Sequence, residues 1–169
     1  MNLSVKTAHF RETTGVGRCG PAALKVVLDY FDMPMTEDEL ADLCGTHPDH
    51  DTTGPQILEA AKLLGFKAKM KDEATYADIE KCLRRKVPPI VVWYTPGDEK
   101  AVRDGFMPDG HYSPVCGLTK THIILEDTEI GRHRKISRKE FIRAWFDYDT
   151  EVPEKDGFFV RRLIVIEKK

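Results

Sequence analysis

Three residues that lie far apart in the sequence have side chains suited to nucleophilic chemistry: Cys19, His111 and Asp127. Cys19 stands directly before a Gly-Pro-Ala segment, at the start of a predicted apolar helix. A free thiol, with a pKa of about 8.5, is mostly protonated at neutral pH, but a helix N-terminus or a nearby imidazolium lowers that pKa. By position alone, Cys19 is equally compatible with an ordinary cysteine near a helix cap. The histidine and the aspartate therefore decide its interpretation.

His111 and Asp127 are predicted to meet across a β-hairpin. If the turn pairs Gly117 with Thr121, His111 falls directly opposite Asp127, and a slip in the turn leaves the two as diagonal neighbours. Opposed residues on one face of a sheet have Cβ atoms roughly 4.5–5.5 Å apart, within hydrogen-bonding reach for Asp and His. A carboxylate at this position would fix the tautomer of the imidazole and stabilise its protonated form.

The three residues together predict more than any one of them. A histidine such as His111 is by itself more often structural than catalytic. A cysteine at a helix start, a histidine at the start of a later strand and an aspartate across the hairpin form the arrangement used in nucleophilic acyl-group chemistry. We therefore predict a cysteine peptidase, or a related amide or isopeptide hydrolase, that acts through a Cys19 thioester.

The other cysteines, Cys44, Cys82 and Cys116, have a different interpretation. No two cysteines form a C-x-x-C pair, so the thiolate patterns of zinc and redox sites are missing, and the sequence predicts neither a metal nor a cofactor. Cys44 ends a predicted helix, Cys82 lies on an amphipathic helix, and Cys116 is on the strand face opposite to that of His111. Buried cysteines of this kind act as small hydrophobes.

Capping patterns predict four helices in the first half of the chain. Pro21 suits a first helical turn, Thr36-x-x-Glu39 is a capping box, and Gly65 follows an apolar stripe as a stop signal. The predicted helices span about residues 20–31, 36–43, 53–65 and 76–84.

In the second half the apolar pattern changes to that of strands. Residues 90–94 form a β-branched and aromatic run typical of a buried strand. Residues 95–110 contain several glycines, prolines and charges, and we expect a long loop there that acts as a lid. Helices followed by antiparallel strands predict an α+β fold, with N-terminal helices packed on a C-terminal antiparallel sheet. The other predicted elements are strands at 111–118, 122–126, 132–136 and 158–166, and a helix at about 137–146.

Length and charge limit the class of protein. A chain of 169 residues is close to the roughly 100–200 residues of one domain, so we expect a single domain over residues 1–169. A formal net charge of −2 argues against binding to nucleic acid or to an anionic membrane. No apolar run approaches the ~18 residues of a membrane span, and the first residues lack the apolar core of a signal peptide. These features predict a soluble cytoplasmic protein.

Several short motifs follow one another in the order found in a known enzyme family. They are RCGPAAL at 18–24, VLDYF at 27–31, the stretch 53–66, PIV at 89–91, GHY at 110–112, LED at 125–127 and the stretch 137–145. Together they resemble the bacteriocin-processing peptidases, a papain-like family that includes transporter domains cutting leader peptides after a double glycine. The resemblance covers about residues 8–147. It implies a papain-like fold with Cys19 as nucleophile, His111 as general base and acid, and Asp127 as orienting residue.

Three positions depart from the pattern of this family. The family usually has a glutamine six residues before the cysteine, which donates to the oxyanion, whereas this chain has Thr13 there. The hydroxyls of Thr13 and Thr14 are the candidate replacements, although losing an oxyanion donor typically costs about 10²–10³ in rate. Thr128 stands where the family commonly has proline. Pro114 cannot donate to a strand ladder and implies an edge or a bulge in the histidine strand.

The remaining polar clusters have simpler interpretations. Residues 47–51 (HPDHD) include metal-ligand types, but His-x-x-His in a proline-containing loop is a weak metal pattern. We expect a solvated loop that borders the substrate cleft. His133 is expected on a solvated face, and the basic residues 84–86 are expected to end a helix, where cations complement its dipole.

Two alternatives from other functional classes stay open. Thr13 in place of glutamine also fits a catalytically weak or inactive peptide-binding module of the same fold. The same three residues fit a papain-like acyltransferase, as in the phytochelatin synthases. The sequence predicts a peptide or protein substrate, and it leaves the identity of that substrate and the oligomeric state open.

Overall fold

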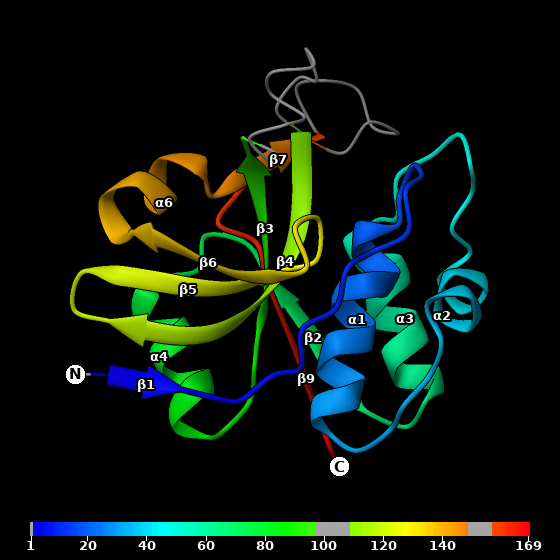
Figure 1. Cartoon of the computed structure of the whole chain (residues 1–169), viewed down its shortest axis with the longest axis horizontal. Helices are drawn as coiled ribbons and strands as arrows, with labels where there is room; N and C mark the ends of the chain where they lie inside the picture. Colours follow the sequence, from blue (N-terminus) through cyan, green and yellow to red (C-terminus); the bar gives the residue numbers. More distant parts are fainter. Residues whose placement is uncertain (1, 97–108, 149–156) are drawn as a thin grey trace.

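The computed structural model describes residues 2–96, 109–148 and 157–169, which build a seven-stranded antiparallel sheet and a small two-stranded sheet (Figure 1). The helices are α1 (Cys19–Tyr30), α2 (Glu37–Cys44), α3 (Gly54–Leu63), α4 (Tyr76–Arg84) and α6 (Arg138–Ala144). The strands are β1 (Asn2–Ser4), β2 (Lys67–Lys71), β3 (Ile90–Thr95), β4 (Asp109–Thr119), β5 (His122–Asp127), β6 (Arg132–Ser137), β7 (Phe146–Tyr148), β8 (Phe158–Val160) and β9 (Leu163–Glu167). The predicted α+β class is confirmed. No helix in the described part of the chain is long and apolar enough to cross a membrane.

The helices begin where their capping residues predict. The side chains of Thr36, Thr75 and Ser137 each take part in a capping box at the start of α2, α4 and α6. Gly45, in the left-handed conformation with φ of 66°, ends α2. Helix α6 ends at Ala144, earlier than predicted, because Phe146 begins strand β7 and pairs with Val160.

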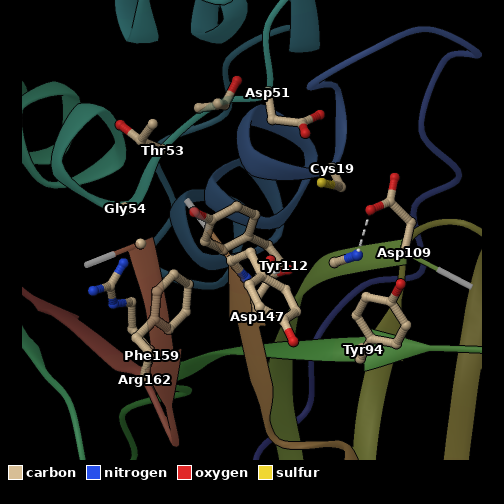
Figure 2. Close-up of a pocket in the computed structure, with 14 residues that line it drawn as sticks. Cys19, Asp51, Thr53, Gly54, Tyr94, Asp109, Tyr112, Asp147, Phe159 and Arg162 are labelled. Carbon is tan, nitrogen blue, oxygen red and sulfur yellow. Dashed lines mark hydrogen bonds between the residues drawn. The ribbon is translucent and has the colours of Figure 1, made fainter. Parts of the chain in front are cut away.

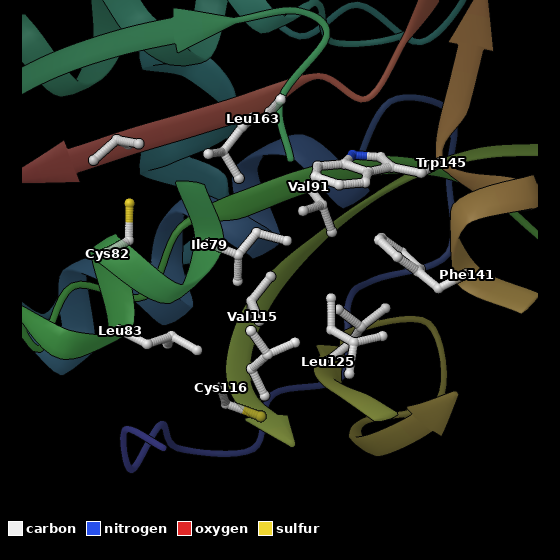
Figure 3. Packing of buried hydrophobic residues seen from close by; sticks show 14 of the residues in the cluster. Ile79, Cys82, Leu83, Val91, Val115, Cys116, Leu125, Phe141, Trp145 and Leu163 are labelled. Carbon is white, nitrogen blue, oxygen red and sulfur yellow. The ribbon is translucent and has the colours of Figure 1, made fainter. Parts of the chain in front are cut away.

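The large sheet has the strand order β2–β9–β3–β4–β5–β6, and its middle is buried on both faces. One face packs on α1 and α3, and α2 packs on these two helices; the cluster includes Ile90 and Val92 of β3. The other face packs on α4 and α6, and its cluster includes Val91 and Trp93 (Figure 3). Alternate residues of β3 therefore enter different cores, which explains the unbroken apolar run in its sequence.

Strand β4 changes partners along its length. Its first half pairs with β3, its second half pairs with β1, and β5 lies along its other edge. The predicted pairing of Gly117 with Thr121 is wrong, because Gly117 pairs with Ile124. The turn lies further along the chain than assumed, between Thr119 and His122, and the register shifts by one between Val115 and Gly117. This irregularity follows directly after Pro114, where an edge or a bulge was expected.

Three short strands, β1, β2 and β7, were not predicted. Strand β2 lies at an edge of the sheet, and its sequence, KAKMK, exposes three lysines while Ala68 and Met70 are partly buried. Lysines of this kind protect a sheet edge from pairing with another chain. They also stand where a strand usually has β-branched or aromatic residues, so the sequence did not indicate a strand. The single strand predicted at 158–166 is two strands, β8 and β9, separated at Arg161, whose φ is 52°. Most of the predicted lid, 97–108, lies outside the described residues.

Candidate active site

Helix α1 carries Cys19 in its first turn, at the point where the chain leaves the segment before the helix. This segment is attached to Thr52, whose hydroxyl donates to the Gly17 carbonyl oxygen over 2.8 Å. A Cβ atom on Gly20 would come within 2.8 Å of the Thr52 methyl carbon, so only glycine allows this close approach. No side chain caps α1, so the helix start has no side-chain partner for its first backbone N–H groups.

Cys19 and His111 lie in contact, one on α1 and the other on β4. The Cys19 thiol forms a hydrogen bond with the His111 ring and another with the backbone of Tyr112. Burial raises the pKa of the Cys19 thiol, and these two bonds oppose the increase. The imidazole therefore offsets part of the cost of placing a sulfur anion in a buried position.

His111 is also bonded to Asp127, as the hairpin prediction required. The distance from His111 Nε2 to Asp127 Oδ1 is 3.0 Å, and the two side chains are almost fully buried. Because Nε2 faces Asp127, Nδ1 is the ring nitrogen available to the Cys19 thiol. Burial lowers the pKa of His111, but the hydrogen bonds to Asp127 and Cys19 outweigh it and hold that pKa well above 6.5. The geometry thus favours a protonated imidazole beside the sulfur.

Arg134, which the sequence did not indicate, extends the hydrogen-bonded series of Cys19, His111 and Asp127. Arg134 of β6 donates from Nε to Asp127 Oδ2 over 2.5 Å. Burial raises the pKa of Asp127, but the hydrogen bond from His111 and the positive charges of His111 and Arg134 bring it below its ordinary value. Arg134 lies diagonally across from Asp127 in the β5–β6 pair. The register of this pair, had it been known, could have identified Arg134.

Thr13 and Thr14, the two expected oxyanion donors, are both exposed to solvent. The Thr13 hydroxyl donates to Glu37 of α2, and the Thr13 backbone N–H donates to the same carboxylate over 3.2 Å. A different residue of this segment, Glu12, interacts electrostatically with both Cys19 and His111. Sequence reasoning missed Glu12, which lies seven positions before the cysteine rather than six.

A cavity of about 690 Å³ opens beside Cys19 (Figure 2). Its walls come from the start of α3, the facing ends of β3 and β4, the small β7–β8 sheet and the residue before β9. Asp51 lines the cavity, so the loop expected to border the cleft does reach it. Aromatic rings of Tyr94, Tyr112 and Phe159 form much of the wall, together with the carboxyl groups of Asp109 and Asp147.

Asp147 is the most strongly perturbed acid of this cavity. Burial, together with the nearby charges of Asp109 and Asp51, raises its pKa to about 7, although the Tyr148 backbone N–H and Arg162 act in the opposite direction. Its carboxyl group packs directly on Gly110, where a Cβ atom would lie 1.9 Å from the Asp147 oxygen. The protonation state of the cavity wall therefore changes near neutral pH.

This shift predicts how Asp147→Asn changes stability with pH. Between the ordinary pKa of 3.8 and the folded value of about 7, the folded chain keeps a proton that the unfolded chain has lost. The free energy of unfolding of the wild type should therefore fall, relative to that of the variant, as pH rises through this range. Urea denaturation at several pH values measures the difference. Asp42→Asn, at an exposed site on α2, is the matched control, and an equal pH slope for Asp147→Asn and wild type would contradict the prediction.

Among the residues that the structure describes, two groups of side chains have the residue types of a metal site, and the ligand atoms of each group lie within 4.8 Å of one another. In the first, buried Glu126 accepts from His9 at 2.9 Å and lies 3.2 Å from His133, which is half exposed. The second consists of His111, Asp127 and Glu129. In both groups the imidazoles already contact the carboxylate, and these contacts account for the arrangement without an ion.

The remaining predicted clusters are structural. Cys44, Cys82 and Cys116 are buried free thiols, and the Cys116 sulfur donates to the carbonyl oxygen of Ile124, away from the site. Helix α4 ends at Arg84, as expected for the basic residues 84–86. Arg84 pairs with Glu80 over 2.6 Å.

Comparison with solved structures identifies the fold. The chain aligns with the peptidase domain of Streptococcus ComA, a bifunctional ABC transporter involved in quorum sensing, at 21% identity, covering 95% of this chain and 98% of that chain, with a TM-score of 0.67. A double glycine motif protease from an AMS/PCAT transporter, solved with its leader peptide, aligns at 20% identity over 98% and 94% of the two chains, with a TM-score of 0.68. A C39-like peptidase from Bacillus anthracis aligns at 13% identity over 100% and 99%, with a TM-score of 0.67.

Comparison of sequences identifies the family. No curated protein sequence matches the chain. The model of the Peptidase C39 family matches residues 11–155, which include Cys19, His111 and Asp127. The chain therefore belongs to the Peptidase C39 family.

Proposed function

We propose that the protein is a cysteine peptidase, or a closely related amide hydrolase, in which Cys19 is the nucleophile, His111 the general acid and base, and Asp127 the residue that orients His111. The single observation that carries this proposal is the series of hydrogen bonds from Cys19 through His111 to Asp127 beside an open cavity. Membership of the Peptidase C39 family supports it.

The first half of the reaction forms a thioester. The Cys19 thiolate attacks the carbonyl carbon of the scissile bond, a C–S bond forms, and the carbonyl oxygen becomes an oxyanion. When the C–N bond breaks, protonated His111 gives its Nδ1 proton to the departing nitrogen, so the amine leaves neutral. The Nε2 proton stays in the hydrogen bond to Asp127, whose lowered pKa keeps it ionised.

The second half regenerates the enzyme. Neutral His111 accepts a proton from water at Nδ1, and the water oxygen attacks the thioester carbonyl. Collapse of this intermediate breaks the C–S bond, releases a carboxylic acid and restores the thiolate beside a protonated imidazole. The proton taken from water thus replaces the one given to the amine. Asp127 and Arg134 change no bonds in either half, and they hold His111 in one orientation.

The substrate we infer is a peptide segment lying in the cavity. The related transporter protease was solved with its leader peptide, which supports a peptide ligand for this chain as well. The aromatic walls formed by Tyr94, Tyr112 and Phe159 suit the apolar parts of such a segment.

The test is to trap the acyl-enzyme with a small activated ester, p-nitrophenyl acetate, and to locate the acetyl group by mass spectrometry of peptides. We expect acetylation of Cys19 and Cys19-dependent release of p-nitrophenol. Cys19→Ala should abolish both, while Cys82→Ala, at a buried cysteine on α4, should retain both. Turnover that survives Cys19→Ala would contradict the proposal.

The same assay separates the two alternatives. A transferase would pass the acetyl group to an added amine in preference to water, so the product would be an amide instead of an acid. A peptide-binding module would give no acetylated Cys19 at all. The exposed positions of Thr13 and Thr14 favour the peptide-binding alternative, because they leave the oxyanion without a threonine donor.

A further inference from the structure

The carboxyl group of Glu126 is fully buried on β5, directly before Asp127. Within the described part of the chain, its partners are the rings of His9 and His133 and the backbone N–H of Phe10. No lysine or arginine of this part forms an ion pair with it. Buried carboxylates in proteins are paired with a cation or coordinate a metal ion. The surroundings of Glu126 therefore favour a positive charge at this place.

Three separate elements bring two imidazoles onto one oxygen of this carboxylate. In the β5–β6 pair His133 lies directly opposite Glu126, and its Nε2 is 3.2 Å from Glu126 Oε2. The segment between β1 and α1 brings His9, whose Nδ1 is 2.9 Å from the same oxygen. The two rings meet edge to face, with their centroids 4.6 Å apart. Two ring nitrogens and one carboxylate oxygen thus converge, all within 4.8 Å of one another.

These separations suit the ligands of a four-coordinate zinc ion. Zn–N and Zn–O bonds of about 2.0–2.2 Å at tetrahedral angles place neighbouring ligand atoms about 3.3–3.6 Å apart. Two histidines and one glutamate form a known zinc ligand set, whereas magnesium and calcium prefer oxygen ligands. The His9 and His133 side chains are 56% and 44% exposed, so an ion can enter from solvent and a water molecule can take the fourth position.

The other clusters of metal-ligand types lack this combination. In the group of His111, Asp127 and Glu129, the Asp127 carboxylate already accepts from the Arg134 cation. In the loop 47–51, the facing histidine and aspartate side chains are both more than half exposed, so solvent already stabilises their charges. The cluster on Glu126 combines a buried carboxylate, two imidazoles and an open side.

We propose that His9 Nδ1, His133 Nε2 and Glu126 Oε2 bind a zinc ion, which fastens the segment before α1 to the β5–β6 hairpin. Both ligating nitrogens give up any proton to the far nitrogen of their ring or to solvent, and ionised Glu126 supplies one negative charge. In the ion-free chain the same atoms contact one another directly, so the ligands are already gathered. The site is independent of the proposed function, because none of its ligands is a candidate catalytic residue.

The experiment is a calorimetric titration of the intact chain with Zn²⁺, after a chelator has removed bound metal. We expect one strong site per chain. His9→Ala and His133→Ala should each weaken it by at least about 10-fold, because losing even an outer-shell partner of a metal typically costs roughly 10–100-fold. His47→Ala is the matched control, since His47 is also a half-exposed histidine beside a carboxylate. It should leave the affinity unchanged.

A second measurement separates this site from the thiol of Cys19, which is also a possible zinc ligand. Co²⁺ replaces Zn²⁺, and its absorption spectrum gains a strong near-ultraviolet band when a thiolate is among the ligands. Co²⁺ bound to the wild type should show visible bands without that band. These visible bands should persist in Cys19→Ala and disappear in His9→Ala.

Zinc should also stabilise the folded chain, because the unfolded chain does not hold the three ligands together. The midpoint of thermal unfolding should increase with Zn²⁺ in the wild type and increase less in Glu126→Gln, which keeps the side-chain shape but loses the charge. If Glu126→Gln fails to fold, as judged by circular dichroism, the two histidine variants still decide the question, since both rings are about half exposed.

Three results would overturn the assignment. The first is a wild type without a strong Zn²⁺ site, and the second is an affinity that His9→Ala and His133→Ala leave unchanged. The third is a site that is lost in Cys19→Ala or His47→Ala, because the ion would then lie elsewhere. Failure of the proposed function is a different result: Cys19 would not be acylated, while Zn²⁺ binding would be unaffected.

Discussion

Iodoacetamide should modify Cys19 at least about 10²-fold faster than it modifies Cys44, Cys82 or Cys116, because only a thiolate reacts and only Cys19 has an imidazole beside it. Burial raises the pKa of Cys44 and of Cys116 to about 12. At pH 7 a thiol with such a pKa is ionised in roughly one molecule in 10⁵. Burial also raises the pKa of Cys82. Peptide mapping of the alkylated protein over time measures all four rates together.

The same experiment tests the role of His111. His111→Ala removes the cation that stabilises the sulfur anion, so Cys19 should return to the behaviour of a buried thiol. Without His111, the increase of the Cys19 pKa by burial is opposed less, so alkylation at neutral pH should slow by about tenfold for each unit by which that pKa rises further. His122→Ala, at the far end of β5 where the ring bonds to Thr121, is the matched control. Equal labelling of the four cysteines in the wild type would contradict the prediction.

The starts of three helices, α2, α4 and α6, were predictable because their signals are local. Thr36, Thr75 and Ser137 each satisfy backbone N–H groups within their own first turn, so these helix starts depend on residues four positions apart at most. Strand β2 was missed because its pairing with β9 involves residues about a hundred positions away. Nothing in the local sequence KAKMK indicates that β9 pairs with it.

The contact between His111 and Asp127 was predicted although the register was wrong. The turn lies further along the chain than assumed, so the partner of Gly117 is Ile124, and the register shift near Cys116 changes the pairing again. Asp127 nevertheless stays a diagonal neighbour of His111, and the two side chains are long enough to bridge that distance. Strand parity with a short turn therefore sufficed for this pair. It did not suffice for Arg134, which depends on the register of a second hairpin.

Glu12 shows why spacing alone fails in an irregular segment. Counting six residues back from the cysteine assumes a fixed path between them. Here Gly17, with φ of 70°, is packed so closely on residues 50–52 that a Cβ atom would lie 2.9 Å from the His50 carbonyl oxygen. The chain turns there in a way that only glycine favours. Which residue of this segment acts electrostatically on Cys19 is thus decided by a loop conformation and by the hydrogen bonds of Glu12 to Thr128, neither of which has a local sequence signal.

Asp127→Asn should reduce ester turnover by about 10⁴, the largest loss expected from a change that keeps the shape of the side chain. Ionised Asp127 accepts from His111 Nε2 and from Arg134, so it holds the Nε2 proton and leaves Nδ1 to exchange protons with the thiol and the leaving group. An amide that turns its NH₂ group toward Nε2 forces the proton onto Nδ1. In that tautomer His111 cannot accept the proton of Cys19.

The loss should be separable from unfolding. Replacing Asp127 also leaves the partly buried Arg134 charge without its carboxylate, which should lower the free energy of unfolding by about 3–5 kcal/mol. Urea denaturation measures this cost. Turnover is then measured without urea, at a temperature at which the variant is folded. Asp42→Asn, exposed on α2, should change neither quantity. Because the tautomer argument concerns proton exchange at Nδ1, alkylation of Cys19 should slow together with turnover. A folded variant with unaltered alkylation and turnover would mean that Asp127 holds the sheet together without orienting His111.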